Sequence, residues 1–287
     1  MTRNAARSTR LATVLVCLAA ACGSSDDDII FPDTDRLVIA VKNDQPGTGY
    51  AENTLRSGLD IQLARELTAD LRGEDDPNWD DVQSETRTTV ITGGRADLVI
   101  ATMSITEDRE DDIDFIGPYA RTQQGFMVRD EDVDRITSLD DLRGERICTW
   151  SGTTSTVALD ESPVGNGGYE AEDASNCIAE LRSGEAFAIS TDQLILYGFA
   201  EHYEELAVVP DLTVGSVNNY GIGIAEDRNE ECERIAEWLK DYVNSGDWDA
   251  AFTDNLGSAS EANPQWQTLF RPDASLIDTY SCQGDDG

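Results

Sequence analysis

Lysine and histidine are scarce in this chain of 287 residues. The sequence contains only two lysines, Lys42 and Lys240, and its 57 acidic residues against 21 lysines and arginines give a formal net charge of −36. Binding of nucleic acid depends on patches of lysine and arginine, so this composition argues against a nucleic-acid partner. We interpret the acidic surface as a solvated one suited to salty surroundings rather than as a partner-binding face.

The common enzyme and metal-site templates are also missing. The single histidine, His202, rules out a cluster of histidine ligands and argues against a Ser-His-Asp triad. No G-x-S-x-G or C-x-x-C motif occurs, and segment 151–155 (SGTTS) lacks the Lys-Ser/Thr ending of a phosphate-binding loop. We therefore expect no catalytic residues, no metal ion and no cofactor.

The first 34 residues have the pattern of an export and anchoring segment. Three arginines among the first ten residues precede an apolar run over 11–21 that is too short to span a bilayer. Segment 18–23 (LAAACG) resembles a bacterial lipobox, whose cysteine becomes the lipidated first residue of the mature protein. We predict a signal peptide over 1–21, a lipid on Cys22 and a tether over 22–34, so that the protein is anchored outside the cytoplasm on the outer face of the cell membrane. Plain secretion with cleavage nearby is the alternative, and no later segment is apolar enough to cross a membrane.

Four cysteines remain when Cys17 in the signal peptide and Cys22 are set aside. An even number of cysteines in an exported protein indicates two disulfides, for which three connectivities exist. We favour Cys148–Cys177 and Cys232–Cys282, because each bond then joins neighbours in sequence.

The hydrophobic pattern alternates between strands and helices. Residues 37–41 and 97–102 predict strands, and a helix from about Asp60 ends at Gly73. Further strands are predicted over 146–150 and 186–190, with helices over 178–182 and 230–243. This alternation predicts an α/β protein of one large or two medium domains.

A polar cluster follows the apolar run Leu98 to Ala101. Ser104 and Arg109 lie beyond this predicted strand, and Thr106 can be the N-cap of a new helix. A hydroxyl, free backbone N–H groups and a guanidinium together can bind a carboxylate at the carboxyl end of a strand. An ordinary strand–helix turn with a surface arginine fits these residues equally well.

Two further polar positions follow predicted strands. Thr153 and Thr154 offer hydroxyls and backbone N–H groups for a second anion site, although a simple turn is an equal alternative. Asp192 can bind an ammonium group or be a helix N-cap. Arg109, Ser104 and Thr154 would suit the carboxylate of an amino acid and Asp192 its ammonium, but sequence spacing does not show that they converge.

Over residues 35–257 the chain resembles the bacterial extracellular solute-binding proteins of family 3, which deliver polar amino acids to ABC transporters. The motifs that carry the resemblance are KNDQPG (42–47), GLDIQLA (58–64), GRADL (94–98), ATMSITEDR (101–109), DFIGPY (114–119), DLRG (141–144), SGTTS (151–155), STD (190–192) and YGIGI (220–224).

The resemblance implies a periplasmic-binding-protein-like fold of type II, in which two α/β lobes close on a ligand. Each lobe would be a mostly parallel sheet flanked by helices. The first lobe would comprise 35–121 plus 221–283 and the second 125–217, with crossings near 122–124 and 218–219.

The resemblance also implies site residues. The residue at Arg109 grips the α-carboxylate with help from Ser104 and Thr154, and the residue at Asp192 takes the α-ammonium. Loop 42–47 looks most like the glutamate-binding branch of the family, in which an arginine aligned with Arg87 contacts the ligand side chain.

Lys42, at the carboxyl end of a predicted strand, could assist Arg87. We therefore expect a monomeric binding protein for glutamate or aspartate, without enzymatic activity, whose partner is an ABC permease in the membrane. A neutral ligand such as glutamine or asparagine, a sensory receptor on the same fold and a dehydratase on a similar fold are the alternatives.

Overall fold

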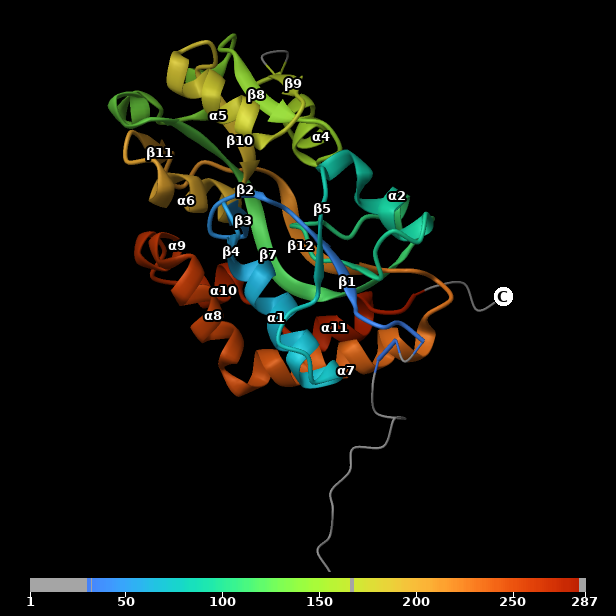
Figure 1. Ribbon diagram of the computed structural model, residues 1–287. Coiled ribbons are helices and arrows are strands. Elements are labelled where there is room, and N and C mark those ends of the chain that lie inside the picture. The colour runs from blue at the N-terminus through green and yellow to red at the C-terminus, as the bar shows by residue number, and fades with distance from the viewer. Residues whose placement is uncertain (1–29, 32, 166–167, 284–287) are drawn as a thin grey trace, which may run out of the picture.

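The computed structural model describes residues 30–31, 33–165 and 168–283. It shows two α/β lobes joined by two long strands (Figure 1). The strands are β1 (Val38–Val41), β2 (Asp44–Gln45), β3 (Gly49–Glu52), β4 (Leu55–Ser57), β5 (Asn78–Asp81), β6 (Leu98–Val99), β7 (Asp114–Arg129), β8 (Ile147–Trp150), β9 (Gly168–Ala171), β10 (Ala188–Asp192), β11 (Leu206–Val208) and β12 (Val214–Ile224).

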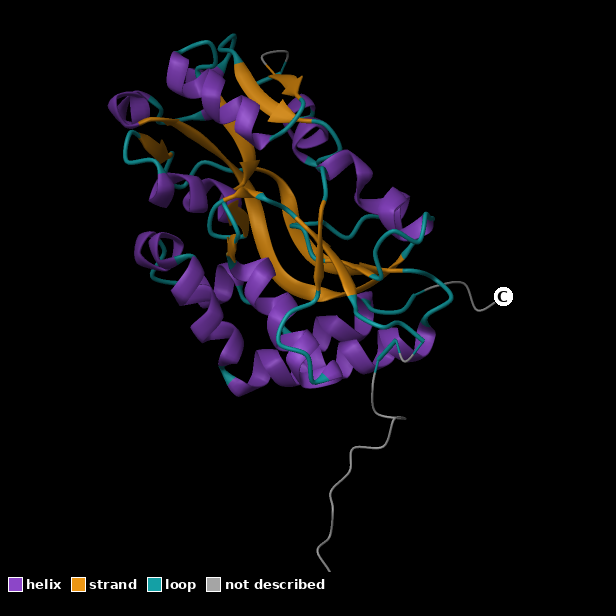
Figure 2. Ribbon diagram, in the orientation of Figure 1, coloured by secondary structure: helices purple, strands orange, loops and turns teal. Residues whose placement is uncertain are grey.

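Helices cover the outer faces of both lobes (Figure 2). They are α1 (Leu59–Arg72), α2 (Arg87–Thr92), α3 (Glu107–Glu110), α4 (Ser155–Asp160), α5 (Ala174–Ser183), α6 (Gln193–His202), α7 (Asn229–Ser245), α8 (Asp247–Asn255), α9 (Gly257–Ala262), α10 (Trp266–Phe270) and α11 (Ala274–Tyr280).

One sheet runs through both lobes in the order β5-β1-β6-β12-β7-β10-β8-β9, and β11 pairs with β7. The strands β5, β1 and β6 are parallel and define lobe 1, whereas the parallel strands β10, β8 and β9 define lobe 2. Between them the antiparallel pair β7 and β12 passes from one lobe to the other, with Thr122 opposite Asn218. The predicted fold class is confirmed.

Lobe 1 has the larger apolar core. Helix α1 buries Leu63, Ala64 and Leu67 against the sheet and ends at Gly73, whose φ of 70° places it in the left-handed region. Helix α7 packs its own apolar side into the same core. Leu194 and Tyr197 of α6 also belong to this cluster, so α6 lies along the seam between the lobes.

The folded part of lobe 1 begins earlier than the sequence predicts. Ile30 and Phe31, expected in the tether, are buried in the lobe 1 core. Arg72 holds this segment in place, because its guanidinium donates hydrogen bonds to the carbonyl oxygens of Ile30 (2.9 Å), Phe31 (2.5 Å) and Thr34 (2.9 Å). The predicted signal peptide and Cys22 lie outside the described residues.

The sequence also predicted some local structure incorrectly. The strand expected over 97–102 is confined to Leu98–Val99, and three residues further on Thr102 turns the chain with a φ of 46°. The loop expected after Lys42 contains β2 and begins a small sheet of its own with β3 and β4. Among the described residues, no helix combines the length and hydrophobicity needed to span a bilayer.

Each lobe contains one disulfide. Cys148 and Cys177 join β8 to α5 in lobe 2, with their Cα atoms 5.6 Å apart. Cys232 and Cys282 join α7 to the residues after α11 in lobe 1, with a Cα separation of 5.9 Å. These are the two pairs that the sequence favoured.

We predict that removing either disulfide lowers the melting temperature markedly. The bonds close loops of 29 and 50 residues, for which chain entropy gives roughly 3.5 and 4 kcal/mol. At about 2–4 °C per kcal/mol for a protein of this size, each loss should exceed roughly 7 °C. Thermal unfolding of the two double Cys→Ala variants measures the effect, and two reactive thiols in the unreduced wild type would contradict the assignment.

Candidate functional site

A small cavity lies between the two lobes. Lobe 1 contributes Gln45, Ser84, Arg87, Thr102 and Ser104 to its wall. Lobe 2 contributes Trp150, Thr153, Thr154, Thr191, Asp192 and Ile195. Five of the seven residues predicted to bind ligand therefore line this cavity.

The cavity lies where strands of both lobes end. Trp150 and Asp192 are the last residues of β8 and β10, and Ser104 follows β6 by five residues. In open α/β sheets the carboxyl ends of parallel strands form the crevice in which ligands bind. The chain therefore brings polar residues from distant segments to one place by topology alone.

Thr102 forms part of the lobe 1 wall in a conformation that a β-branched residue seldom adopts, with a φ of 46°. Its backbone N–H donates to Asp60 Oδ2 (3.0 Å) and to the Tyr119 hydroxyl (3.1 Å). Its hydroxyl donates to Gln45 Oε1 at 2.9 Å. These contacts fix the backbone turn on which the lobe 1 side of the cavity is built.

Asp60 supports this turn from the first turn of α1 and is fully buried. It accepts a hydrogen bond from the Tyr119 hydroxyl at 2.9 Å in addition to that from Thr102. Burial raises the pKa of Asp60 to about 6, although both hydrogen bonds act in the opposite direction. The sequence suggested Asp60 only as the start of a helix.

Arg87 is buried and donates to backbone carbonyls of both lobes. Its Nε donates to Ser84 O (3.0 Å), its Nη1 to Ala101 O and Thr102 O (both 2.9 Å), and its Nη2 to Gly152 O (2.8 Å). These bonds use four of the five N–H groups of a guanidinium. Burial, and then the charge of Arg109, lower the pKa of Arg87 to about 9.

Arg109 lies beside the cavity rather than in its wall. Its Nη1 donates to Ser104 O at 2.5 Å and its Nη2 to Gly152 O at 3.0 Å. The carbonyl of Gly152, from lobe 2, thus lies against two lobe 1 guanidinium groups. Thr106 is at the N-cap position of the short helix α3 as predicted, but its side chain makes no capping hydrogen bond.

Asp192 is the buried acid on the opposite side of the site. It occupies the N-cap position of α6, yet its side chain makes no capping hydrogen bond. Its oxygens instead accept from Asn218 Nδ2 (2.6 Å) and from the Tyr220 hydroxyl (2.8 Å), both on β12. Burial raises the pKa of Asp192, whereas these donors and the two arginines favour its ionised form.

The two threonines predicted from the SGTTS segment have different surroundings. Thr153 donates its hydroxyl hydrogen to Trp150 O at 2.8 Å. The Thr154 hydroxyl oxygen accepts from Gln124 Nε2 (3.3 Å) and from Asn218 Nδ2 (3.2 Å). Thr154 is therefore linked to Asp192 through Asn218, whose Nδ2 donates to both side chains.

Lys42 is buried but is absent from the cavity wall. Its Nζ lies 3.4 Å from Asp44 Oδ1 in an ion pair. Burial lowers the pKa of Lys42, and the Asp44 carboxylate opposes this shift. The structure therefore pairs Lys42 with an acid of its own lobe, and its part in ligand binding stays a prediction.

The sequence analysis missed six residues of the cavity wall: Gln45, Ser84, Thr102, Trp150, Thr191 and Ile195. Trp150 and Ser84 are buried, and within the described part of the chain Trp150 Nε1 and Ser84 Oγ have no hydrogen-bond partner. An unpaired polar group is costly to bury, so a ligand atom is the expected partner. The only sequence signal for Trp150 was its place at the end of a predicted strand.

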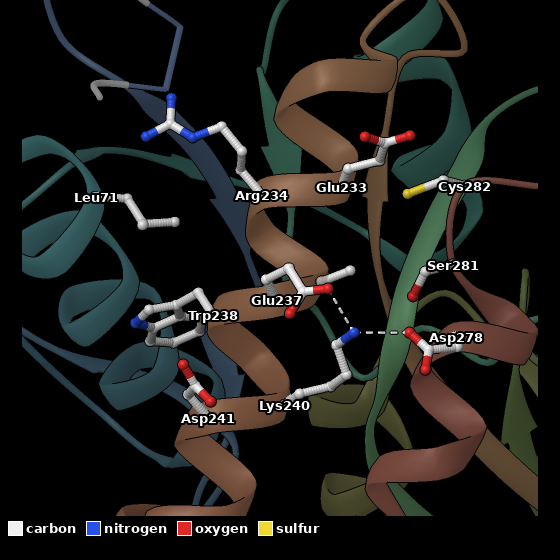
Figure 3. Close-up of a pocket in the computed structure, with 11 residues that line it drawn as sticks. Leu71, Glu233, Arg234, Glu237, Trp238, Lys240, Asp241, Asp278, Ser281 and Cys282 are labelled. Carbon is white, nitrogen blue, oxygen red and sulfur yellow. Dashed lines mark hydrogen bonds and ion pairs between the residues drawn. The ribbon is translucent and has the colours of Figure 1, made fainter. Parts of the chain in front are cut away.

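A larger groove, of about 700 Å³, lies on the outside of lobe 1 between α7 and α11 (Figure 3). Its polar groups already pair with one another, since Lys240 contacts Glu237 at 2.7 Å and Asp278 at 2.8 Å. Lobe 2 contributes no lining residue. We therefore assign the site to the cavity between the lobes, and no cluster of potential metal ligands occurs in residues 30–31, 33–165 and 168–283.

Two α/β lobes that enclose a polar cavity and are joined by two crossing strands define a two-lobed solute-binding protein. The family described as bacterial extracellular solute-binding proteins, family 3, matches residues 37–258, and the chain belongs to this family. The resemblance seen in the sequence is thereby confirmed.

Individual relatives agree with this assignment. The glutamate-binding protein GluB of Corynebacterium efficiens is 34% identical over 256 residues, which cover 84% of this chain and 86% of the relative. The ABC transporter glutamine-binding protein GlnH of Bacillus subtilis is 27% identical over 258 residues, 83% of this chain and 91% of the relative. A solved solute receptor for L-cysteine from Neisseria gonorrhoeae, 19% identical, has a TM-score of 0.73 over 83% of this chain and 96% of that one, which shows the shared fold.

We predict that Asp60 makes stability depend on pH. Its folded-state pKa near 6 lies above the ordinary 3.8, so the folded protein keeps this proton between about pH 4 and 6 after the unfolded chain has lost it. The stabilisation is full below pH 4 and is lost as the pH rises through 6, by roughly 3 kcal/mol.

Chemical denaturation of the wild type and Asp60→Asn at several pH values measures this effect. The free energy of unfolding of the wild type should fall relative to that of Asp60→Asn between pH 4 and 7. Asp112→Asn, at an exposed position, is the matched control. A difference between wild type and Asp60→Asn that stays constant over this range would rule out the assigned role.

Proposed function

We propose that this protein is the extracytoplasmic binding component of an amino-acid ABC importer and that it binds glutamate or aspartate between its lobes. The observation that carries the proposal is the distribution of charge around the cavity. The guanidinium groups of Arg87 and Arg109 come from lobe 1, and the carboxylate of Asp192 comes from lobe 2. An amino acid carries the complementary pair of charges.

The α-carboxylate of the ligand is assigned to Arg109, with Ser104 and Thr154 as further donors. Arg109 already binds the Gly152 carbonyl oxygen, so it can bind a carboxylate oxygen in the same region. The α-ammonium is assigned to Asp192. Gln124 Oε1, on the residue whose amide nitrogen contacts Thr154, is a buried oxygen without a partner in the described chain and could accept a further ammonium hydrogen.

The unpaired atoms of the cavity wall support an acidic side chain on the ligand. Trp150 Nε1 can only donate a hydrogen bond, Ser84 can donate through its hydroxyl, and Arg87 has one N–H beyond its four backbone contacts. A side-chain carboxylate accepts from all three, whereas the amide of glutamine also needs an acceptor for its NH₂ group. The 34% identity to a glutamate-binding protein agrees with this choice.

The remaining expectations are part of the same proposal. Lobe 1 comprises residues 35–121 plus 221–283 and lobe 2 residues 125–217, with Ile30 and Phe31 extending lobe 1 at its start. The protein works as a lipid-anchored monomer through Cys22 and delivers its ligand to a membrane permease, without covalent chemistry. A sensory lipoprotein would have the same fold and is distinguished by its membrane partner.

We predict that Arg109→Ala abolishes amino-acid binding while the protein remains folded. The loss of a charge-assisted partner in a closed site costs about 2–5 kcal/mol, or roughly 30-fold to several-thousand-fold in affinity. Arg95→Ala, which removes an exposed arginine of the same lobe, is the matched control and should bind like the wild type. Calorimetry measures the affinity, and circular dichroism shows whether the variant is folded. Near-wild-type binding by folded Arg109→Ala would show that Arg109 does not bind the ligand.

We predict that Trp150→Phe and Ser84→Ala each reduce the preference for an acidic ligand. In the wild type, L-glutamate should bind at least tenfold more tightly than L-glutamine, a gap of about 1.4 kcal/mol. Each variant loses one donor, so its affinity for glutamate should fall more than its affinity for glutamine. Competition calorimetry gives both affinities for each variant. Equal affinities of the wild type for the two amino acids would overturn the proposal that the ligand is acidic.

A further inference from the structure

Two glycines outside the cavity wall lie where the backbone of lobe 2 closely approaches the backbone of lobe 1. Gly198 is inside α6 of lobe 2 and faces the turn at Pro46 and Gly47 of lobe 1. Gly152, between β8 and α4 of lobe 2, faces Ser84 and Glu85 of lobe 1. We call these two places the glycine contacts.

The contact at Gly198 has no room for a side chain. A Cβ atom at this position would lie 1.8 Å from the carbonyl oxygen of Pro46 and 2.7 Å from its carbonyl carbon. Both are backbone atoms, so no side-chain rotation relieves the clash. Glycine is less favourable than alanine inside a helix, and Gly198 has no positive φ that would require it. The close approach of lobe 1 is therefore the reason that glycine fits here.

The lobe 1 turn cannot easily retreat from α6. The carbonyl oxygen of Gly47 accepts from Leu59 N at 3.0 Å, and that of Thr48 accepts from Asp60 N at 3.0 Å, so the turn is bonded to the start of α1. Behind it, a Cβ at Gly47 would meet Leu256 Cδ2 at 2.7 Å. Extra volume at Gly198 must therefore move the lobes apart rather than only the turn.

The contact at Gly152 lies on the same seam and involves the arginines. A Cβ at Gly152 would lie 2.4 Å from both the Cα and the N of Glu85. The Gly152 carbonyl oxygen accepts from Arg87 and Arg109. Approach of the lobes at this contact therefore also adds one hydrogen bond to each guanidinium group.

We propose that Gly198 is an affinity-determining residue that acts through lobe closure, without touching the ligand. The glycine contacts set how closely lobe 2 can approach lobe 1. A methyl group at Gly198 holds the lobes apart, so that Trp150, Thr154 and Asp192 no longer reach a ligand held by lobe 1. This inference rests on the proposed binding of an amino acid between the lobes.

The experiment compares Gly198→Ala with Gly257→Ala, using L-glutamate as the probe. Gly257 is the first residue of α9, and a Cβ there would meet nothing within 4 Å. Three quantities are measured for each protein: the melting temperature without ligand, the dissociation constant by calorimetry, and the radius of gyration by small-angle X-ray scattering at saturating ligand.

For Gly198→Ala we expect a melting temperature equal to or above that of the wild type, because alanine favours the helix and, on this inference, lobes that no ligand holds together can separate and avoid the clash. We expect an affinity at least tenfold weaker and a larger radius of gyration at saturation. Gly257→Ala should match the wild type in affinity and radius.

An affinity of Gly198→Ala within twofold of that of the wild type would overturn the inference. A melting temperature several degrees below that of the wild type would also overturn it, because Gly198 would then be needed for packing in the unliganded fold. If instead the proposed ligand is wrong, the wild type itself will not bind glutamate, so the two outcomes can be told apart. If the wild type binds L-glutamine, the same three measurements with L-glutamine test whether Gly198 acts through lobe closure. That test does not depend on the ligand being acidic.

Discussion

The structure depends on how charged side chains are buried in the seam between the lobes. An unpaired buried charge costs several kcal/mol, so each must be satisfied by the chain or by a ligand. Arg87 and Arg109 of lobe 1 both donate to the carbonyl oxygen of Gly152 in lobe 2. Asp192 of lobe 2 accepts from Tyr220, which packs in the lobe 1 core. The closed arrangement is thus held by polar contacts that cross the seam.

This arrangement explains how binding can be coupled to movement. If the lobes separate, the arginines lose the Gly152 oxygen and Asp192 loses Tyr220, but water can replace these partners. In the proposed complex, an amino acid supplies a carboxylate and an ammonium to the same groups and pairs with the donors Trp150 Nε1 and Ser84 Oγ, which have no partner in the described chain. A ligand that pairs these groups better in the closed state shifts the population toward it. In the importer that we propose, the membrane permease would recognise this closed form.

The sequence was informative where local pattern and topology decide the outcome. The hydrophobic pattern and Gly73 located α1, and the same reasoning located α7. Strand ends singled out Ser104, Thr153, Thr154 and Asp192, the family resemblance implied a joint ligand site for Ser104, Thr154 and Asp192, and the structure places all four in one cavity wall. The sequence could not reveal contacts that only the assembled fold creates. Asp60 looked like a helix start, Trp150 like the end of a strand and Ile30 like a tether residue. Their roles come from partners about 40 or more residues away, or from unpaired atoms that no spacing shows.

A crystal structure of the protein with L-glutamate tests the central claim most directly. The account predicts closed lobes, with the α-carboxylate on Arg109, the α-ammonium on Asp192 and the side-chain carboxylate next to Trp150 Nε1, Ser84 and Arg87. Glutamate bound in the groove between α7 and α11, or bound between the lobes with its ammonium away from Asp192, would contradict the account.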